Sequence, residues 1–168
     1  MLTCSALTVR VAGRQLVRDL SFSLAPGDVV CLLGPNGVGK TLTLHTLAGL
    51  RPPGKGSISL GSDELTRLRR RQIAQRLGLL LQDDAETFPA TVLDTALMGR
   101  HPHLTGTAAE SPDDLARARA ALLAMGLANY GDRLVSTLSG GERRRPVLAR
   151  LLRKHPTVLL LHHPVNDL

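Results

Sequence analysis

The chain has 168 residues, 43% of them hydrophobic, and a formal net charge of +7. This length predicts one domain with a real core, and the hydrophobic fraction excludes a disordered chain. The sequence has two cysteines, no apolar run near 18 residues and no signal-peptide pattern, which argues against a disulfide framework, a transmembrane helix and secretion, so a cytoplasmic location is expected.

The first third of the chain begins with two alternating segments. Leu7–Val11 and Leu16–Leu24 alternate apolar and polar residues around a turn at Gly13, which predicts an antiparallel β layer. The next apolar run, Val29–Leu33, is typical of a strand buried in a sheet, and such a strand would bury the Cys31 thiol.

A glycine-rich loop follows this run and opens an apolar-periodic segment, Thr41–Leu50, that predicts a helix. Its spacing, Gly-x4-Gly-Lys-Thr, is the phosphate-binding loop pattern. Glycines let successive amides face a phosphate, and the helix N-terminus adds a favourable dipole. Lys40 would reach the outer phosphates and the Thr41 hydroxyl would bind magnesium. The loop consists of Gly34, Pro35, Asn36, Gly37, Val38, Gly39, Lys40 and Thr41.

The stretch after the helix predicts a strand at Ser57–Leu60, a surface helix over Asp63–Arg76 and a strand at Gly78–Leu81 that delivers Gln82 to a loop. The surface helix is rich in arginine, which is compatible with a nucleic-acid patch or with a solvated helix face. No aromatic residues alternate with the arginines, so the solvated face is favoured and no nucleic-acid partner is expected. The arginines are Arg67, Arg69, Arg70 and Arg71.

Helices are predicted in the middle of the chain. Thr91 is expected to cap one that runs to Gly99, and Asp113 to cap one over Asp114–Met125 that Gly126 ends. Between them, the pair His101 and His103 is compatible with metal binding or with exposed loop histidines, and the second is favoured.

A second motif, Leu-Ser-Gly-Gly-Glu at Leu138–Glu142, precedes a basic helix over Arg143–Lys154. Ser139 is a natural N-cap, and the glycines leave backbone amides open to an anion. A proline, Pro146, falls inside this helix, where it removes one hydrogen bond at a cost of about 3 kcal/mol or a kink. The apolar run Thr157–Leu161 then predicts a buried strand.

Together these motifs resemble the ATP-binding subunit of ABC transporters, and Met98–His103 is similar to the importers of iron-siderophore, heme and cobalamin. The resemblance implies an α/β fold: a P-loop NTPase (RecA-like) parallel-sheet core with an N-terminal antiparallel β layer and an inserted helical subdomain. Residues 1–168 would form a single, incomplete ATP-binding domain. Residues 1–81 and 137–168 would be its core and 82–136 its helical subdomain.

The resemblance also implies roles for single residues. The loop from Gly34 to Thr41 would hold the triphosphate of ATP, and Thr41 and Gln82 would bind Mg2+, with Gln82 also at the attacking water. Two subunits would pair head to tail beneath transmembrane permease subunits, at the inner face of the cell membrane. The γ-phosphate on the opposite subunit would then meet Ser139, Gly140 and Gly141.

Several positions depart from the family pattern. His162 stands where an Asp supports the magnesium ion, and His163 stands where a Glu acts as general base. Imidazoles bring no negative charge to the metal when they are neutral, so we expect hydrolysis slowed by at least ~100-fold. Val11 stands at the position of the aromatic that stacks on adenine. The sequence stops at Leu168, before the remaining family strands, so the last core elements are expected to be missing.

The leading hypothesis is an importer's ATP-binding subunit that couples ATP binding and hydrolysis to transport. Whether this chain is an ATPase stays open, because both catalytic acids are replaced. The alternatives are a regulatory or structural nucleotide-binding subunit that does not hydrolyse ATP, and a non-functional fragment. More distant alternatives are a small-molecule P-loop kinase and a nucleic-acid-handling relative.

Overall fold

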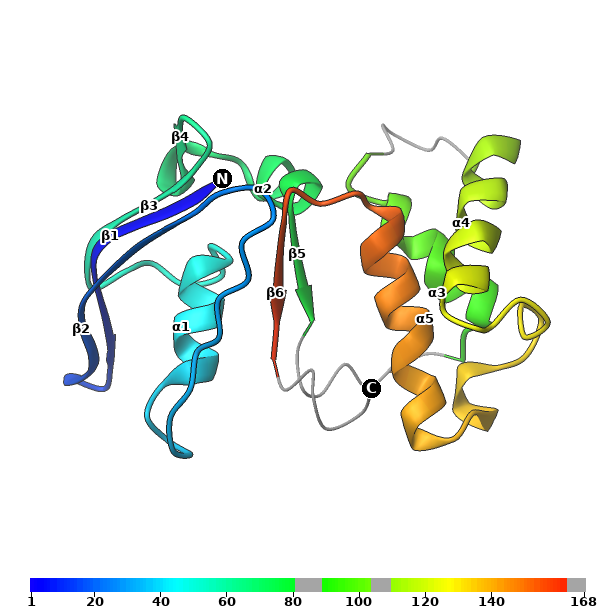
Figure 1. Cartoon of the computed structure of the whole chain (residues 1–168), viewed down its shortest axis with the longest axis horizontal. Coiled ribbons are helices and arrows are strands. Elements are labelled where there is room, and N and C mark those ends of the chain that lie inside the picture. The colour runs from blue at the N-terminus through cyan, green and yellow to red at the C-terminus, as the bar shows by residue number, and fades with distance from the viewer. Residues whose placement is uncertain (81–88, 104–109, 163–168) are drawn as a thin grey trace. The chain divides into compact units, whose positions relative to one another are not determined.

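The computed structural model describes residues 1–80, 89–103 and 110–162 (Figure 1). The chain divides into two compact units, Met1–Leu77 and Gly78–Leu168, each of which is described by itself below. Within the described ranges, no helix combines the length and the apolar character needed to cross a membrane.

A four-stranded antiparallel sheet forms the first unit (Figure 1). The long hairpin of β1 (Leu2–Val11) and β2 (Arg14–Leu24) pairs Leu2 with Leu24 and Val9 with Val17. On the other side of β1 lie β3 (Lys55–Leu60) and the short β4 (Asp63–Glu64), giving the order β2-β1-β3-β4. The predicted antiparallel β layer is therefore confirmed, with longer strands than the alternation alone indicated.

The strand pairing of this sheet is irregular around Ala6. Ala6 and Asp19 have left-handed backbone (φ 47° and 51°), and the β1–β2 and β1–β3 registers shift around Ala6. Gly56 on β3 also has a positive φ of 83°, and a Cβ there would collide with the carbonyl oxygens of Ser5 and Ala6. Only glycine fits where β3 passes this bulge.

The helix α1 (Lys40–Leu47) packs on the sheet against β1 and buries Thr43, Thr46 and Leu47. It begins at Lys40 in the predicted loop and ends at Leu47, two residues before Gly49, whose φ is +71°. The predicted helix is thus confirmed, although it stops before Leu50.

The prediction of a single surface helix over Asp63–Arg76 is wrong for the first half of this segment. Asp63 and Glu64 instead pair with β3, a 3-10 turn follows over Leu65–Arg67, and only α2 (Arg70–Arg76) is α-helical. Gly61 turns the chain back, and the Arg76 guanidinium bonds both Asp63 (Nη1 to Oδ2, 2.7 Å) and the Leu60 carbonyl. Hydrogen bonds to β3 therefore outweigh the helical pattern of this segment.

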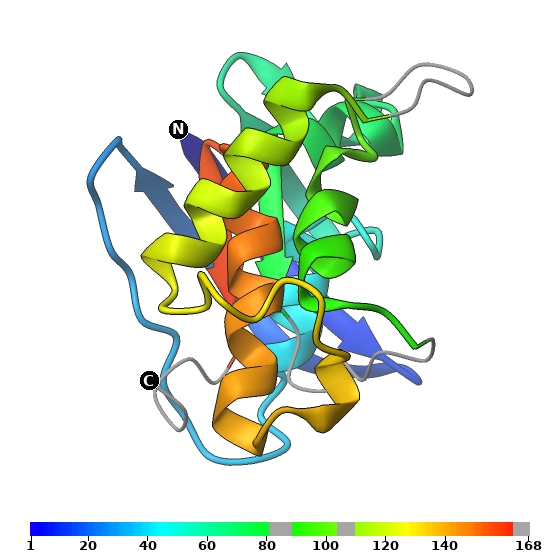
Figure 2. The same ribbon diagram turned by 90° about the vertical axis from the view of Figure 1, so that its right-hand side faces the viewer.

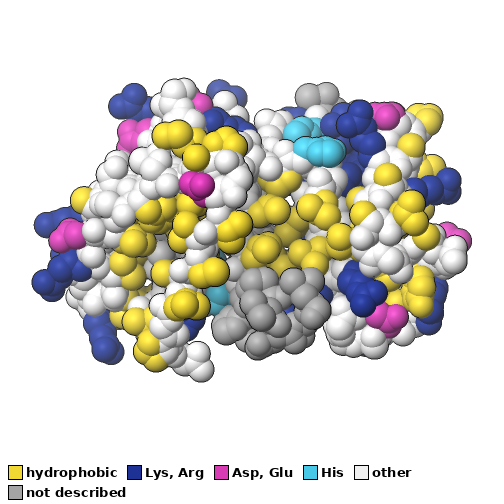
Figure 3. All heavy atoms as spheres, in the orientation of Figure 1, with side chains coloured by type: hydrophobic (Ala, Val, Ile, Leu, Met, Phe, Trp, Pro, Cys, Tyr) yellow, Lys and Arg dark blue, Asp and Glu magenta, His cyan; other side chains and the backbone are white. Residues whose placement is uncertain are grey.

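The prediction of a strand at Val29–Leu33 is also wrong. Residues 28–35 have no regular structure, Val29 and Leu33 are 88% and 87% exposed, and the Cys31 thiol is exposed rather than buried. Figure 3 shows hydrophobic side chains on the surface along this connection. An apolar run becomes a strand only when neighbouring strands accept its hydrogen bonds, and no described strand of the first unit pairs with it.

The second unit contains a parallel pair, β5 (Leu77–Leu80) and β6 (Val158–Leu161), whose arrows run in the same direction in Figure 1. Gly78 lies under the neighbouring strand, because a Cβ there would be 2.7 Å from Leu159 Cδ2. The predicted parallel strands are confirmed over Gly78–Leu80 and Val158–Leu161; Leu81 lies outside the described residues.

The described residues of this unit also form three α-helices, which contact one another (Figure 2): α3 (Val92–Leu97), α4 (Pro112–Ala124) and α5 (Gly140–Arg153). Short 3-10 turns follow α3 at Met98–Arg100 and precede α5 at Val135–Thr137. Their shared core consists of Val92, Ala96, Ala118, Leu122, Leu127, Val135, Leu138 and Ala149.

Helix starts in this unit are fixed by capping boxes. Thr91 caps α3 as predicted, with its hydroxyl 3.0 Å from the Asp94 amide. The cap of α4 is Ser111 and not the expected Asp113, because Pro112 fits the first helical turn and the Asp114 carboxylate accepts from the Ser111 amide at 3.0 Å. Gly126 follows α4 with a φ of +71°.

Candidate nucleotide-binding site

The phosphate loop is an exposed turn that ends in α1. Gly37 and Gly39 have φ values of 79° and 103°, a region that L side chains rarely adopt. Gly39 is the residue before α1, and a Cβ there would lie only 3.0 Å from the Leu16 side chain. The glycines predicted from the spacing are therefore required by the backbone at these two positions.

The Lys40 side chain folds back over this loop. Its Nζ donates to the Gly34 carbonyl at 2.6 Å and to the Pro35 carbonyl at 2.9 Å. An ammonium group has three donors, and these two hydrogen bonds use two of them to fix its position. The cation is held at the loop itself, although Gly34 and Lys40 are six residues apart in sequence.

These residues fit a polyphosphate. Helix α1 carries no acidic residue in its first turn, and the loop residues before it are exposed. Open amides at the helix start, the α1 dipole and Lys40 all favour an anion. Phosphate binding by this loop remains a prediction, supported by this geometry.

The residues predicted to bind magnesium are only partly described. Thr41 is exposed in the first turn of α1, while Gln82 and His163 lie outside the described residues. Within residues 1–80, 89–103 and 110–162, no cluster of three or more His, Cys, Asp or Glu is placed to hold a metal. Of the positions that the resemblance assigns to magnesium, Thr41 lies in the first unit and His162 lies in the second.

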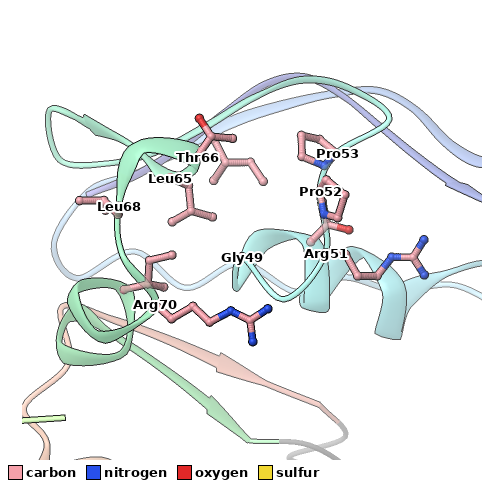
Figure 4. Close-up of a pocket in the computed structure, with 11 residues that line it drawn as sticks. Gly49, Arg51, Pro52, Pro53, Leu65, Thr66, Leu68 and Arg70 are labelled. Atoms are coloured by element: carbon pink, nitrogen blue, oxygen red, sulfur yellow. The ribbon is translucent and has the colours of Figure 1, made fainter.

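The cavity of the first unit does not coincide with the phosphate loop. It has a volume of about 290 Å³ and lies between the end of α1 and the segment 65–73, with the Arg70 side chain reaching beneath Gly49 (Figure 4). The loop, by contrast, is an open surface. At the position expected to stack on adenine, Val11 is 39% exposed.

The second motif lies at the start of α5, with Ser139 as the N-cap residue. Gly140 and Gly141 are exposed, and nothing lies within 4 Å of a Cβ built on either. Arg143 fixes the turn before them, since it donates to the Leu138 carbonyl at 2.9 Å and to the Ser136 carbonyl at 2.7 Å. Gly140 and Gly141 therefore present open backbone at the N-terminus of a 14-residue helix.

The carboxylate of Glu142 binds the same cap residue. Its Oε2 accepts from the Ser139 hydroxyl at 2.6 Å and from the Ser139 amide at 2.9 Å. These hydrogen bonds, with smaller contributions from Arg133 and Arg145, hold the pKa of Glu142 below its ordinary value. The sequence prediction missed this contact, although Ser followed three residues later by Glu is the capping-box signal.

A buried histidine, His162, lies at the end of β6. It directly follows the strand, is 6% exposed, and its backbone amide donates to the Leu80 carbonyl at 3.0 Å, which continues the pairing with β5. The position where an Asp was expected therefore lies at the carboxyl end of a parallel strand, where the ligands of open α/β sheets bind.

The ABC transporter family model matches residues 17–166, so the chain belongs to the ABC transporter family. It is 38% identical to the hemin import ATP-binding protein HmuV of Gloeobacter violaceus, covering 100% of this chain and 63% of the relative. It is 35% identical to the cobalamin import ATP-binding protein BtuD of Halobacterium salinarum, covering 99% and 42%.

The fold agrees with this assignment. The solved dimeric structure of MJ0796, a bacterial ABC transporter cassette, superposes with a TM-score of 0.84 at 20% identity, covering 100% of this chain and 76% of that one. The chain spans less than two thirds of the length of the HmuV and BtuD relatives named above. The P-loop NTPase fold is thereby confirmed.

Proposed function

We propose that this chain binds ATP as the nucleotide-binding part of an importer and acts with a second copy or a paired subunit beneath a permease. The observation that carries the proposal is the Lys40 ammonium fixed at 2.6 Å and 2.9 Å by carbonyls of a loop with left-handed glycines. Such a loop serves polyphosphate binding.

The second motif supports the same function. Its exposed glycines at the start of α5 offer amides to a phosphate carried by another subunit. Head-to-tail pairing would bring Ser139, Gly140 and Gly141 of one copy to the nucleotide on the loop of the other. Thr41 and Gln82 would hold Mg2+, which neutralises phosphate charge when bound.

The imported substrate is proposed from the relatives. The two named above are hemin and cobalamin import proteins, at 38% and 35% identity. Both substrates are metal-containing macrocycles. We therefore propose a hemin- or cobalamin-type substrate, with an iron-siderophore as the related alternative.

Hydrolysis is proposed to be slow. His162 stands at the end of β6 in place of the metal-supporting acid, and His163 in place of the general base. General-base catalysis is typically worth ~10²–10⁴-fold, so we propose a rate lowered at least ~100-fold. This observation favours a second candidate function, a nucleotide-binding subunit that does not hydrolyse ATP and regulates an intact partner.

ATP binding by the chain, measured by calorimetry, tests the main proposal. Lys40→Ala should weaken binding at least ~10-fold, because the fixed cation is lost. Lys55→Ala is the matched control, since Lys55 is an exposed lysine on β3 of the same unit. Equal affinity in the parent chain and Lys40→Ala would contradict the proposal.

Single-turnover cleavage then separates the two candidate functions. The double variant His162→Asp, His163→Glu should cleave bound ATP at least ~100-fold faster than the parent chain if the substituted acids limit the rate. A parent rate equal to that of the double variant would contradict slow hydrolysis. Binding without turnover in the parent favours the regulatory candidate.

A further inference from the structure

In the described part of the second unit, three helices begin with the same contact, a cap hydroxyl that donates to the carboxylate three residues further on. At the starts of α3 and α4, the hydroxyls of Thr91 and Ser111 donate to the carboxylates of Asp94 and Asp114, at 2.7 Å and 3.0 Å. They also accept from the amides of the same residues, at 3.0 Å and 3.2 Å. The Ser139 side chain has the same capping-box arrangement at the start of α5. Its partner is the Glu142 carboxylate at 2.6 Å.

A serine hydroxyl has one hydrogen to donate. At Ser139 this hydrogen points to a carboxylate, and a charge-assisted O–H···O bond of this length is among the stronger hydrogen bonds in proteins. A phosphate oxygen that approaches Ser139 is also an acceptor and also negative. It therefore competes with Glu142 for the one hydrogen and is repelled by its charge.

Hydrogen bonds and nearby positive charge keep the Glu142 carboxylate ionised. The Ser139 hydrogen bonds lower the pKa of Glu142 most, and Arg133 and Arg145 lower it further through their charge. Glu142 is therefore charged throughout the neutral range. Arg133 is itself held over the Tyr130 ring, 4.8 Å from its centroid.

We propose that Glu142 is a positioning residue that holds the hydroxyl hydrogen of Ser139 in the nucleotide-free chain, so that a phosphate on a second copy must displace this carboxylate before Ser139 donates to it. The proposal rests on the proposed function, because the competing phosphate is the nucleotide of the paired subunit. Glu142 thus opposes nucleotide-driven pairing while it stabilises the start of α5.

Self-association of the full chain with ATP, measured by analytical ultracentrifugation, tests the proposal. Glu142→Gln keeps the shape and an acceptor oxygen but removes the charge, and should strengthen association about fivefold. In the Ser139→Ala background the same change should have less than a twofold effect, because no hydroxyl hydrogen remains to be released. Glu110→Gln, the same change at an exposed residue of this unit, controls for net charge.

Amide hydrogen exchange without ATP tests the contact independently. The Ser139 amide should exchange more slowly than those of Gly140 and Gly141, and this protection should fall in Glu142→Ala. Unprotected Ser139, or a Glu142→Gln gain that persists in Ser139→Ala, would overturn the proposal. Absence of ATP binding in every variant would overturn the proposed function and this inference with it, whereas ATP-dependent association without coupling between the two positions would overturn this inference alone.

Discussion

Arg153, in the last turn of α5, is buried against Asp114 in the first turn of α4. The guanidinium Nη2 lies 2.9 Å from Asp114 Oδ1, and Nε donates to the Asp114 carbonyl at 3.2 Å. The two side chains are 2% and 6% exposed. Arg153 Nη1 also donates to the Leu97 carbonyl at the end of α3. One side chain therefore joins the ends of three helices, including the helix that carries the Ser139 motif.

Replacing Arg153 with Met should lower the melting temperature by about 5 °C or more, because the Asp114 carboxylate then loses a buried partner. Arg100, whose Nε lies 3.0 Å from Asp114 Oδ1, would remain as its only ion-pair partner among the described residues. The control is Arg117→Met, which breaks an exposed pair with Asp113. Equal melting temperatures of the two variants would show that burial of the Arg153 pair adds nothing.

The same carboxylate predicts a pH dependence. Hydrogen bonds from Ser111, with Arg100 and Arg153 nearby, hold the pKa of Asp114 below its ordinary value. A lowered folded pKa contributes stability that is present above the unfolded pKa, near ~3.9, and lost as pH falls through the folded value. Denaturant titrations from pH 6 downward should therefore show a decline in unfolding free energy near and below pH ~4. An Asp114→Asn variant should show a shallower decline, and parallel curves would contradict the assignment.

Pro146 predicts a gain in stability. It lies buried inside the continuous helix α5, where it cannot donate to the Glu142 carbonyl. Pro146→Ala restores that hydrogen bond and removes the helix-interior penalty of proline, ~3 kcal/mol, but loses about two buried methylenes at ~0.8 kcal/mol each. The unfolding free energy should therefore rise by about 1 kcal/mol. A decrease in chemical denaturation would mean that packing of the ring outweighs the helix penalty.

The sequence predicted those elements whose signals are local. The β1–β2 hairpin followed from alternation, α1 from the apolar periodicity of Thr41–Leu50 and α3 from the Thr91 cap. The fold and the family were accessible from two short motifs. In each case the residues that determine the structure lie within a few positions of the element itself.

Elements that depend on distant partners were predicted less well. Val29–Leu33 has the composition of a buried strand, yet no neighbouring strand of its unit supplies hydrogen bonds. The segment that begins at Asp63 has a helical pattern, but its first residues pair with β3 instead. Side-chain contacts at the site, such as Ser139 with Glu142, required coordinates because a capping signal does not say where a hydroxyl hydrogen points.

The bulge in the first sheet gives the last prediction. Gly56 has a φ of +83°, and a Cβ at this position would collide with backbone carbonyls of Ser5 and Ala6, which cannot move aside without breaking the β1–β3 pairing. Gly56→Ala should therefore lower the unfolding free energy by at least ~2 kcal/mol. Gly131→Ala is the control, because a Cβ there has only an ordinary contact, 3.8 Å from Leu93 Cβ. Denaturation midpoints that shift equally for the two variants would show that the bulge tolerates a side chain at Gly56.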